Sequence, residues 1–372
     1  MTTVNPLQTQ INSVIALYSN GQIEEALDSV GALIKDYPNE ALLYNISGAC
    51  YAGLGQLDTA VKLYEKTIAM KPDYAEAHNN LGVTLHDLGQ LDAAVKSYEQ
   101  ALAIKPDYAN ACNNLGVTLQ ELGQLDAAVK SYEQALALKP DFADAYNNLG
   151  ITLMKLGQLD AAIKSYEQAL AINPDYAEAH NNHGNALMDL GQLDAALKSY
   201  EQALAINPDY ADAFNNLGNA LRGLGRLDAA VKCYEKAVAI KPDYAEAYHN
   251  HGNVLLGLKR EDEALASYES TIALNPNLDF ILGDLLHTKM HLCLWDNLEK
   301  RLNELTKKIN NDEKVINPFH MLSLIDDPEV QRKTAEIYAN EKYPQSHVLS
   351  QIERYPKHKK IRIGYFSGDF HN

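Results

Sequence analysis

Residues 75–108 read AEAHNNLGVTLHDLGQLDAAVKSYEQALAIKPDY. The same 34-residue pattern recurs along the chain, and its period is marked by eight prolines: Pro38, Pro72, Pro106, Pro140, Pro174, Pro208, Pro242 and Pro276. A period of this length is typical of tandem helix-turn-helix units that stack into a solenoid. We therefore expect an all-α fold in which each unit packs against its neighbours in sequence.

Each unit predicts a pair of helices. In the quoted stretch, Asp73 and Glu76 have the spacing of a capping box at a helix start. Gly89 supplies the positive φ that ends this first helix. The second helix carries an apolar stripe that begins at Leu91, and Pro106 ends it.

Small and large residues recur at matching positions in the two helices. The first helix carries Gly48, Gly82, Gly116, Gly150, Gly184, Gly218 and Gly252, and the second carries Tyr64, Tyr98, Tyr132, Tyr166, Tyr200, Tyr234 and Tyr268. This pattern resembles the tetratricopeptide (TPR) consensus. It implies a superhelical solenoid over residues 1–278, with eight repeats that start near 7, 41, 75, 109, 143, 177, 211 and 245. The first repeat is degenerate, with Val14 and Val30 in place of the glycine and the tyrosine.

The charge of the chain is uneven. Its formal net charge is −17, and residues 279–372 carry equal numbers of acidic and basic side chains, so the negative excess lies in the repeats. A negative array repels phosphate backbones and anionic lipids, which disfavours nucleic acid and membranes as partners. The alternative is that this charge serves solubility alone.

Cysteine use and the N-terminal sequence indicate a compartment. No CxxC spacing links the four cysteines, Cys50, Cys112, Cys233 and Cys293, which argues against a zinc site or a disulfide framework. The N-terminal residues lack the basic flank and apolar run of a signal peptide, and no segment approaches ~18 uninterrupted apolar residues. We expect a cytoplasmic protein.

One polar position of the first helix is asparagine in every internal repeat: Asn80, Asn114, Asn148, Asn182, Asn216 and Asn250. Asparagine costs helix stability relative to alanine, so its recurrence calls for a reason. A row of amides can hold the backbone of an extended peptide in the concave groove, because each amide is both donor and acceptor. The alternative is that duplication copied a tolerated residue. The adjacent asparagines from Asn79 to Asn215 favour that alternative.

Two further rows complete the candidate peptide-binding surface. An acidic row lies four positions before the asparagines and consists of Glu76, Asp144, Glu178, Asp212 and Glu246, interrupted at Asn110. Its first expected role is helix capping, and peptide binding is an addition. The later repeats add a third row, Asn185, Asn219 and Asn253, where the earlier repeats have aliphatic residues. The groove should therefore become more polar towards its C-terminal end.

The period stops after Pro276. Residues 278–309 predict two helices, the second of them capped by Asp296 after the single tryptophan, and a further helix follows Pro328. His287 and His291 share one helix face near Cys293, but no further ligand follows at a spacing usual for metals, so we expect no metal. Residues 279–354 are interpreted as a helical cap and linker.

The last residues, 359–372, read KKIRIGYFSGDFHN. Ile361, Ile363 and Tyr365 alternate with Arg362 and Gly364, which predicts a buried strand that runs into a loop. A lone strand cannot satisfy its own hydrogen bonds. We therefore expect residues 355–372 to be the start of an α/β domain that this chain contains in part.

The chain resembles the protein O-linked N-acetylglucosamine transferase family, in its bacterial, SPINDLY-like form. Four features carry this resemblance: the repeats with an asparagine row, the WDN-helix, the INPFHMLSL segment and IRIGYFSGDFHN. The resemblance implies a TPR superhelix that feeds protein substrates to a two-domain, GT-B-type transferase. It also implies that the asparagine row matches the family's asparagine ladder and that the acidic row is similar to its aspartate ladder. His371 stands where many members have glycine, so no catalytic residue is assigned in this chain.

The leading interpretation is therefore the substrate-recognition arm of a UDP-GlcNAc:protein Ser/Thr transferase-like protein, inactive as this chain alone. No cofactor is expected in the chain, because the UDP-sugar would bind further downstream in an intact homologue. The alternative is a stand-alone TPR scaffold that assembles protein complexes. Both interpretations leave open a homodimer through the convex face.

Overall fold

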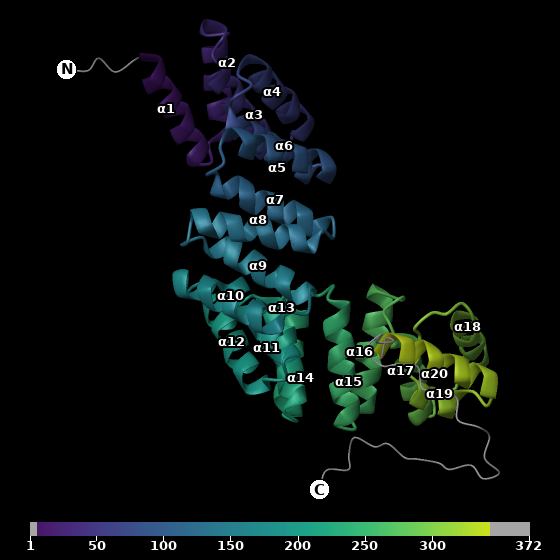
Figure 1. Ribbon diagram of the computed structural model, residues 1–372. Coiled ribbons are helices and arrows are strands. Elements are labelled where there is room, and N and C mark those ends of the chain that lie inside the picture. Colours follow the sequence, from purple (N-terminus) through teal and green to yellow (C-terminus); the bar gives the residue numbers. More distant parts are fainter. Residues whose placement is uncertain (1–5, 343–372) are drawn as a thin grey trace, which may run out of the picture. The chain divides into compact units, whose positions relative to one another are not determined.

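The computed structural model describes residues 6–342, and every regular element in this range is a helix (Figure 1). The first helices of the repeats are α1 (Pro6–Ser19), α3 (Ala41–Gly53), α5 (Ala75–Asp87), α7 (Ala109–Glu121), α9 (Ala143–Lys155), α11 (Ala177–Asp189), α13 (Ala211–Gly223) and α15 (Ala245–Gly257). The second helices are α2 (Ile23–Asp36), α4 (Leu57–Met70), α6 (Leu91–Ile104), α8 (Leu125–Leu138), α10 (Leu159–Ile172), α12 (Leu193–Ile206), α14 (Leu227–Ile240) and α16 (Glu261–Leu274). The predicted all-α repeat fold is confirmed, whereas the predicted strand lies outside the described residues.

Contacts divide the chain into two units, Met1–Arg260 and Glu261 onward. The first unit holds α1–α15 and the second begins with α16, so the division falls within the last sequence repeat. The domain boundaries expected from the sequence, at residues 278 and 354, stay predictions.

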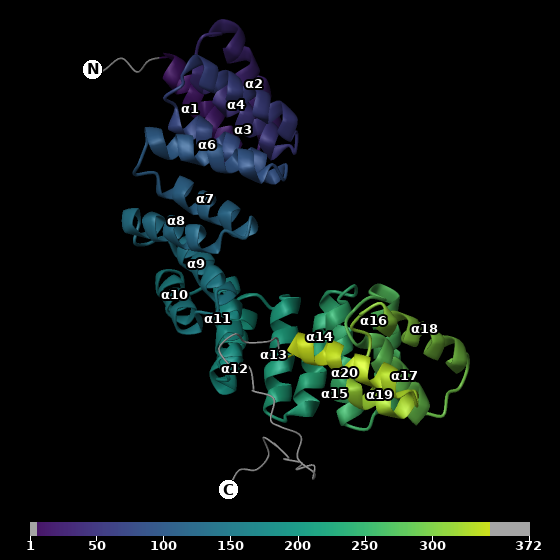
Figure 2. The same ribbon diagram turned by 45° about the vertical axis from the view of Figure 1, so that its right-hand side comes forward.

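Within the first unit the helix pairs stack in sequence order (Figure 2). Each second helix packs against its own first helix and against the first helix of the next repeat, as α6 does against α5 and α7. First helices of neighbouring repeats, such as α5 and α7, also contact each other directly. This additional contact places the first helices on the inner side of the stack.

The recurring glycine and tyrosine form the tightest contact within each repeat. In the fifth repeat, a Cβ atom at Gly150 of α9 would lie 2.5 Å from the ring of Tyr166 on α10. Tyr166 is almost fully buried, as are its counterparts in the other repeats. The glycine is therefore required because only a hydrogen atom leaves room for the ring.

The capping boxes predicted at the first helices are absent, which corrects the sequence interpretation. Helix α5 begins at Ala75 with Tyr74 as its N-cap residue, and no side chain caps it. Asp73 lies in the preceding turn, one position too early to reach the free N–H groups of the first turn. The ring of Tyr74 instead makes a cation–π contact with Lys71, whose Nζ lies 5.0 Å from the ring centroid. Tyrosine or phenylalanine occupies the N-cap position of every first helix from α5 to α15.

The second unit continues from α16 into α17 (Ile281–His291), α18 (Leu298–Asn310), α19 (Pro318–Leu324) and α20 (Pro328–Lys342). Its core includes Leu286 of α17, Leu305 and Ile309 of α18, and Met321 of α19. The three predicted helices of this region are thus present as α17, α18 and α20. The N-cap of α18 is Asn297, with a positive φ of 57°, and not Asp296 as predicted.

The helices are short. Helices α5 and α6 span 13 and 14 residues, and the longest helix between residues 6 and 342 has 15. Within this range none is long and apolar enough to cross a membrane.

Candidate functional site

The asparagine row lies on the first helices of successive repeats, from Asn80 on α5 to Asn250 on α15, and every member is half-buried. The residue before each member behaves differently. Asn79, Asn113, Asn147, Asn181 and Asn215 are buried, and Asn147 is only 1% exposed. A buried amide must find hydrogen-bond partners within the protein.

The two asparagines of neighbouring repeats bond to each other. Nδ2 of each row member donates to Oδ1 of an asparagine 35 positions earlier, at 3.0–3.3 Å: Asn80 to Asn45, Asn114 to Asn79, Asn148 to Asn113, Asn182 to Asn147, Asn216 to Asn181 and Asn250 to Asn215. The asparagine pair is therefore a clip between repeats. This gives the buried asparagines a role that the sequence interpretation missed, although their 35-residue spacing from the row was visible.

Each clip fixes the orientation of a row amide. A primary amide has two N–H donors and an oxygen with two acceptor sites, and the clip uses one donor. In Asn114, Asn148 and Asn182, the second N–H and Oδ1 take part in no hydrogen bond within the described part of the chain. Oδ1 of Asn80 and Oδ1 of Asn216 each also accept from the preceding asparagine, at 3.4 Å. The row thus presents an oriented amide once per repeat.

Asparagines of the third row accept hydrogen bonds from tyrosines of the core. Oδ1 of Asn185 accepts a hydrogen bond of 2.8 Å from the hydroxyl of Tyr200, and Oδ1 of Asn219 accepts one of 2.8 Å from Tyr234. Asn253 is half-buried at the matching position of α15. Asn185 and Asn219 therefore satisfy buried tyrosine hydroxyls, which leaves their amide N–H groups for any ligand.

Members of the acidic row contact the last residues of their own repeat and do not cap their own helix. Oε1 of Glu76 lies 3.3 Å from Nζ of Lys105. Burial raises the pKa of Tyr176, and the nearby Asp144 carboxylate, a hydrogen-bond partner of its hydroxyl, raises it further. The same two causes, with Asp212 as the partner, raise the pKa of Tyr244.

The members of the acidic row differ in exposure. Asp144, Glu178, Asp212 and Glu246 are exposed, and Glu76 is half-buried. Their binding role stays a prediction.

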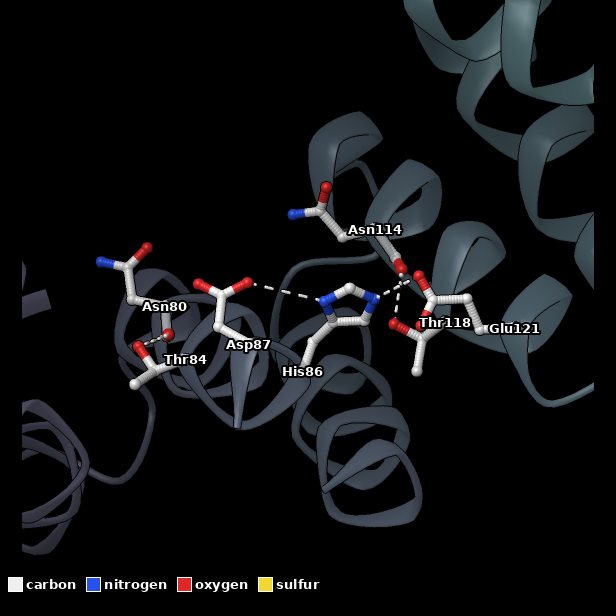
Figure 3. A network of polar contacts seen from close by, with 7 residues as sticks. All are labelled: Asn80, Thr84, His86, Asp87, Asn114, Thr118 and Glu121. Atoms are coloured by element: carbon white, nitrogen blue, oxygen red, sulfur yellow. Dashed lines mark hydrogen bonds and ion pairs between the residues drawn. The ribbon is translucent and has the colours of Figure 1, made fainter. Parts of the chain in front are cut away.

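A polar network joins α5 and α7 beside the row (Figure 3). Nε2 of His86 lies 3.0 Å from Oε1 of Glu121, and its Nδ1 lies 3.6 Å from Oδ1 of Asp87. Thr84 and Thr118 donate hydroxyl hydrogen bonds to the backbone carbonyls of Asn80 and Asn114, one helical turn earlier. Figure 3 shows the Asn80 and Asn114 amides clear of these contacts. The network joins the two helices and does not involve the side-chain amides of Asn80 and Asn114.

The second unit carries three histidines close together, His287, His291 and His320. Between residues 6 and 342, no group of three or more histidine, cysteine, aspartate or glutamate side chains is arranged to hold a metal ion. The four cysteines are free thiols, and burial raises the pKa of Cys233 to about 11. Such a raised pKa leaves that thiol protonated and unreactive at neutral pH.

Comparison with protein-family models identifies the repeats. A model described as TPR repeat matches residues 48–89, 84–123, 119–157, 184–225 and 218–259, and models described as tetratricopeptide repeat match residues 12–65, 143–176, 165–198 and 245–278. The chain belongs to the tetratricopeptide-repeat family. These TPR matches fall on the predicted array, and no curated protein matches the chain.

Several solved structures are similar to the chain. A structure of the APC/C heterotetramer Cut9–Hcn1 is 18% identical, with a TM-score of 0.56, and the match covers 77% of this chain and 57% of that one. MamA is 29% identical over 45% of this chain and 97% of its own, with a TM-score of 0.42. YrrB, titled a TPR protein with an unusual peptide-binding site, is 27% identical over 50% of this chain and 96% of its own, with a TM-score of 0.43. The Cut9–Hcn1 likeness concerns the fold alone.

Proposed function

We propose that the TPR array binds extended polypeptide segments along the asparagine row. The observation that carries this proposal is the clip, because it orients each row amide and leaves an N–H and an oxygen for a ligand. A peptide backbone also offers N–H and C=O groups at regular intervals, so the two patterns are complementary. Nothing in this contact depends on the side chains of the peptide.

Binding through such a row should be weak at each repeat and additive along the array. A net hydrogen bond is worth about 0.5–1.5 kcal/mol, and ordering a flexible peptide costs a large part of the sum. Because every clip is already formed in the free array, the row amides lose little freedom on binding. We therefore expect affinity to rise with peptide length until the peptide spans the row.

Backbone recognition is tested with peptides of one sequence that differ in the backbone alone. An unmodified peptide of about 15 residues and a version with alternate amides N-methylated are titrated against the chain by fluorescence anisotropy. N-methylation removes backbone donors and keeps the side chains. The proposal requires the methylated peptide to bind at least tenfold more weakly, and equal affinities would contradict it.

We propose further that the array is the substrate arm of an O-linked glycosyltransferase that uses a UDP-sugar. Support comes from the order of three sequence features, the asparagine row, INPFHMLSL and IRIGYFSGDFHN. The last feature lies outside the described residues. Reading the source gene past codon 372 and measuring the intact mass of the native protein tests this proposal. A frame that continues into a transferase domain supports it, and a native mass near 41.1 kDa contradicts it.

A stand-alone scaffold is the second candidate, and one observation favours it. Phe319 and Leu322 lie on one face of α19 and are 84% and 63% exposed, which is unusual for apolar side chains on a short helix. A partner protein could cover them. If the scaffold interpretation holds, deletion of residues 355–372 leaves partner binding intact, whereas Phe319→Ser weakens it.

A further inference from the structure

Three imidazole rings form a row in the second unit, between α17 and α19. His287 of α17 is the central ring. Its centroid lies 4.0 Å from that of His320 on α19, with the two planes only 14° apart, so these rings are stacked. On the other side its centroid lies 4.3 Å from that of His291, one turn along α17.

Two carboxylates bracket the row. Nδ1 of His320 lies 3.0 Å from Oδ1 of the buried Asp284, and Nδ1 of His291 lies 3.2 Å from Oε1 of Glu261 at the start of α16. The central ring has no such partner, because Nδ1 of His287 is buried without a hydrogen bond. Each outer ring therefore has a carboxylate partner at its Nδ1, and Nδ1 of the central ring has none.

Helix α19 is a short element of the second unit. It is seven residues long, and Met321 and Leu324 are its buried apolar anchors. Asn317 caps it by accepting a hydrogen bond of 3.0 Å from the backbone N–H of His320. The stack of His320 on His287 and the contact of His320 with Asp284 join α19 to α17 through polar side chains.

We propose that the histidine row is an acid-sensitive latch: the uncharged ring of His287, stacked on His320, holds α19 on α17, and protonation of His287 releases α19. A proton on His287 would place a positive charge on a half-buried ring whose Nδ1 has no hydrogen-bond partner. Release would expose the core that Met321 and Leu324 help to cover. The latch would therefore couple acidity to the packing of the cap.

The charged groups around His287 agree with this account. Burial is the largest cause that lowers the pKa of His287, to about 4, and the neighbouring His320 and His291 lower it further. Asp284 and Glu261 act in the opposite direction and are outweighed. These four groups come from α16, α17 and α19, and none comes from the described residues of α18, which also packs on α17.

The sign of the pH dependence follows from this lowered pKa. Release of α19 removes His320 from beside His287 and exposes the ring, so the pKa of His287 rises from about 4 towards its ordinary value of 6.5. Between these values the released state binds the extra proton, so docking weakens as the pH falls from 6.5 towards 4. Above pH 6.5 the latch is at full strength.

Hydrogen exchange of the full chain, followed by mass spectrometry, tests the latch. Protection factors for residues 317–325, corrected for intrinsic exchange rates, are compared at pH 7.5, 6.5, 5.5 and 4.5. In the wild type we expect protection to fall by up to about tenfold per pH unit below pH 6.5, the limit for one linked proton. Because neither replacement can take up a proton, His287→Leu and His287→Gln should both remove most of this fall.

His180→Gln is the control, because it removes a histidine from α11 in the first unit. This variant should behave like the wild type. Protection that does not change with pH in the wild type would overturn the proposal. An equal fall in the wild type and in both His287 variants would also overturn it, because the sensitivity would then lie elsewhere.

Discussion

Nδ2 of Asn182 donates a hydrogen bond of 3.1 Å to Oδ1 of Asn147, which lies 35 residues earlier on the preceding first helix. One member of this pair is buried and the other is half-buried. The same bond recurs between each pair of neighbouring repeats from Asn45 to Asn250. A TPR array is held together by such nearest-neighbour contacts, so the clip contributes to stability, and it also orients the amides that we propose bind peptide.

The clip predicts that two single substitutions break the same hydrogen bond but lower the free energy of unfolding by different amounts. Asn182→Ala and Asn147→Ala break the same hydrogen bond. We expect Asn182→Ala to destabilise by about 0.5–1.5 kcal/mol, as for one partly exposed hydrogen bond. Asn147→Ala should cost more, about 1–3 kcal/mol, because it also removes a buried side chain. Urea denaturation followed by circular dichroism measures both, and a harmless Asn147→Ala would contradict the structural role.

The contact between glycine and tyrosine predicts opposite effects at two helical glycines. Gly150→Ala forces a methyl group to within 2.5 Å of the Tyr166 ring and should destabilise by about 1–3 kcal/mol. Gly31→Ala lies in helix α2 with no atom within 4 Å of the new methyl group. It should stabilise by about 0.5–1 kcal/mol, because alanine is the better helix former. Thermal unfolding of the two variants measures both changes in stability. If both substitutions raised or both lowered the unfolding temperature, the packing account would be contradicted.

Two core tyrosines predict different costs for loss of the hydroxyl. Tyr200 donates to Asn185, whereas the hydroxyl of Tyr132 is buried without a hydrogen-bond partner. Tyr200→Phe should therefore destabilise by about 0.5–1.5 kcal/mol, and Tyr132→Phe should be neutral or stabilising. Adding Asn185→Val to Tyr200→Phe should restore most of the loss, since both polar groups are then gone. The two single variants and the double variant are compared by their urea unfolding midpoints. A larger loss of stability for Tyr132→Phe than for Tyr200→Phe would contradict the assigned contacts.

His183 predicts acid sensitivity of the array itself. It occupies the position of Leu81, Leu115, Leu149 and Leu217 in other repeats, its Nδ1 lies 3.1 Å from Oγ of Ser199, and burial lowers its pKa. A histidine with a lowered pKa stabilises fully above its ordinary value of 6.5, and this contribution is lost as the pH falls below it. His183→Leu should therefore gain more stability at pH 5 than at pH 7.5. Equal gains at both pH values would show that His183 does not titrate.

The fold could be predicted from the sequence because its determinants lie within one repeat. Gly89 adopts a positive φ of 72°, and the Gly82–Tyr98 contact joins helices only a few residues apart. The capping prediction was wrong because helix α5 begins one residue later than the D-x-x-E spacing implies, which leaves Asp73 in the turn.

The candidate site was harder to predict because it depends on how the repeats pair. The sequence shows an asparagine pair but not that one asparagine bonds the next repeat, since that contact requires the register between repeats. Asn185 likewise shows its structural role only once Tyr200 is placed beside it. The stack of His287 on His320 joins residues 33 positions apart outside the periodic region, where no repeat pattern guides prediction.

The central claim is that the row asparagines bind peptide backbone and that their buried partners do not. The direct measurement compares two triple variants, Asn148→Ala/Asn182→Ala/Asn216→Ala and Asn113→Ala/Asn147→Ala/Asn181→Ala, by titration with one extended peptide at a temperature where both are folded. The two variants break the same three clips, at 3.2, 3.1 and 3.0 Å. Only the first removes the amides that we propose bind the peptide. We predict a loss of peptide affinity of tenfold or more for the first variant and at most about threefold for the second. Equal affinities of the two variants for the peptide would contradict the claim.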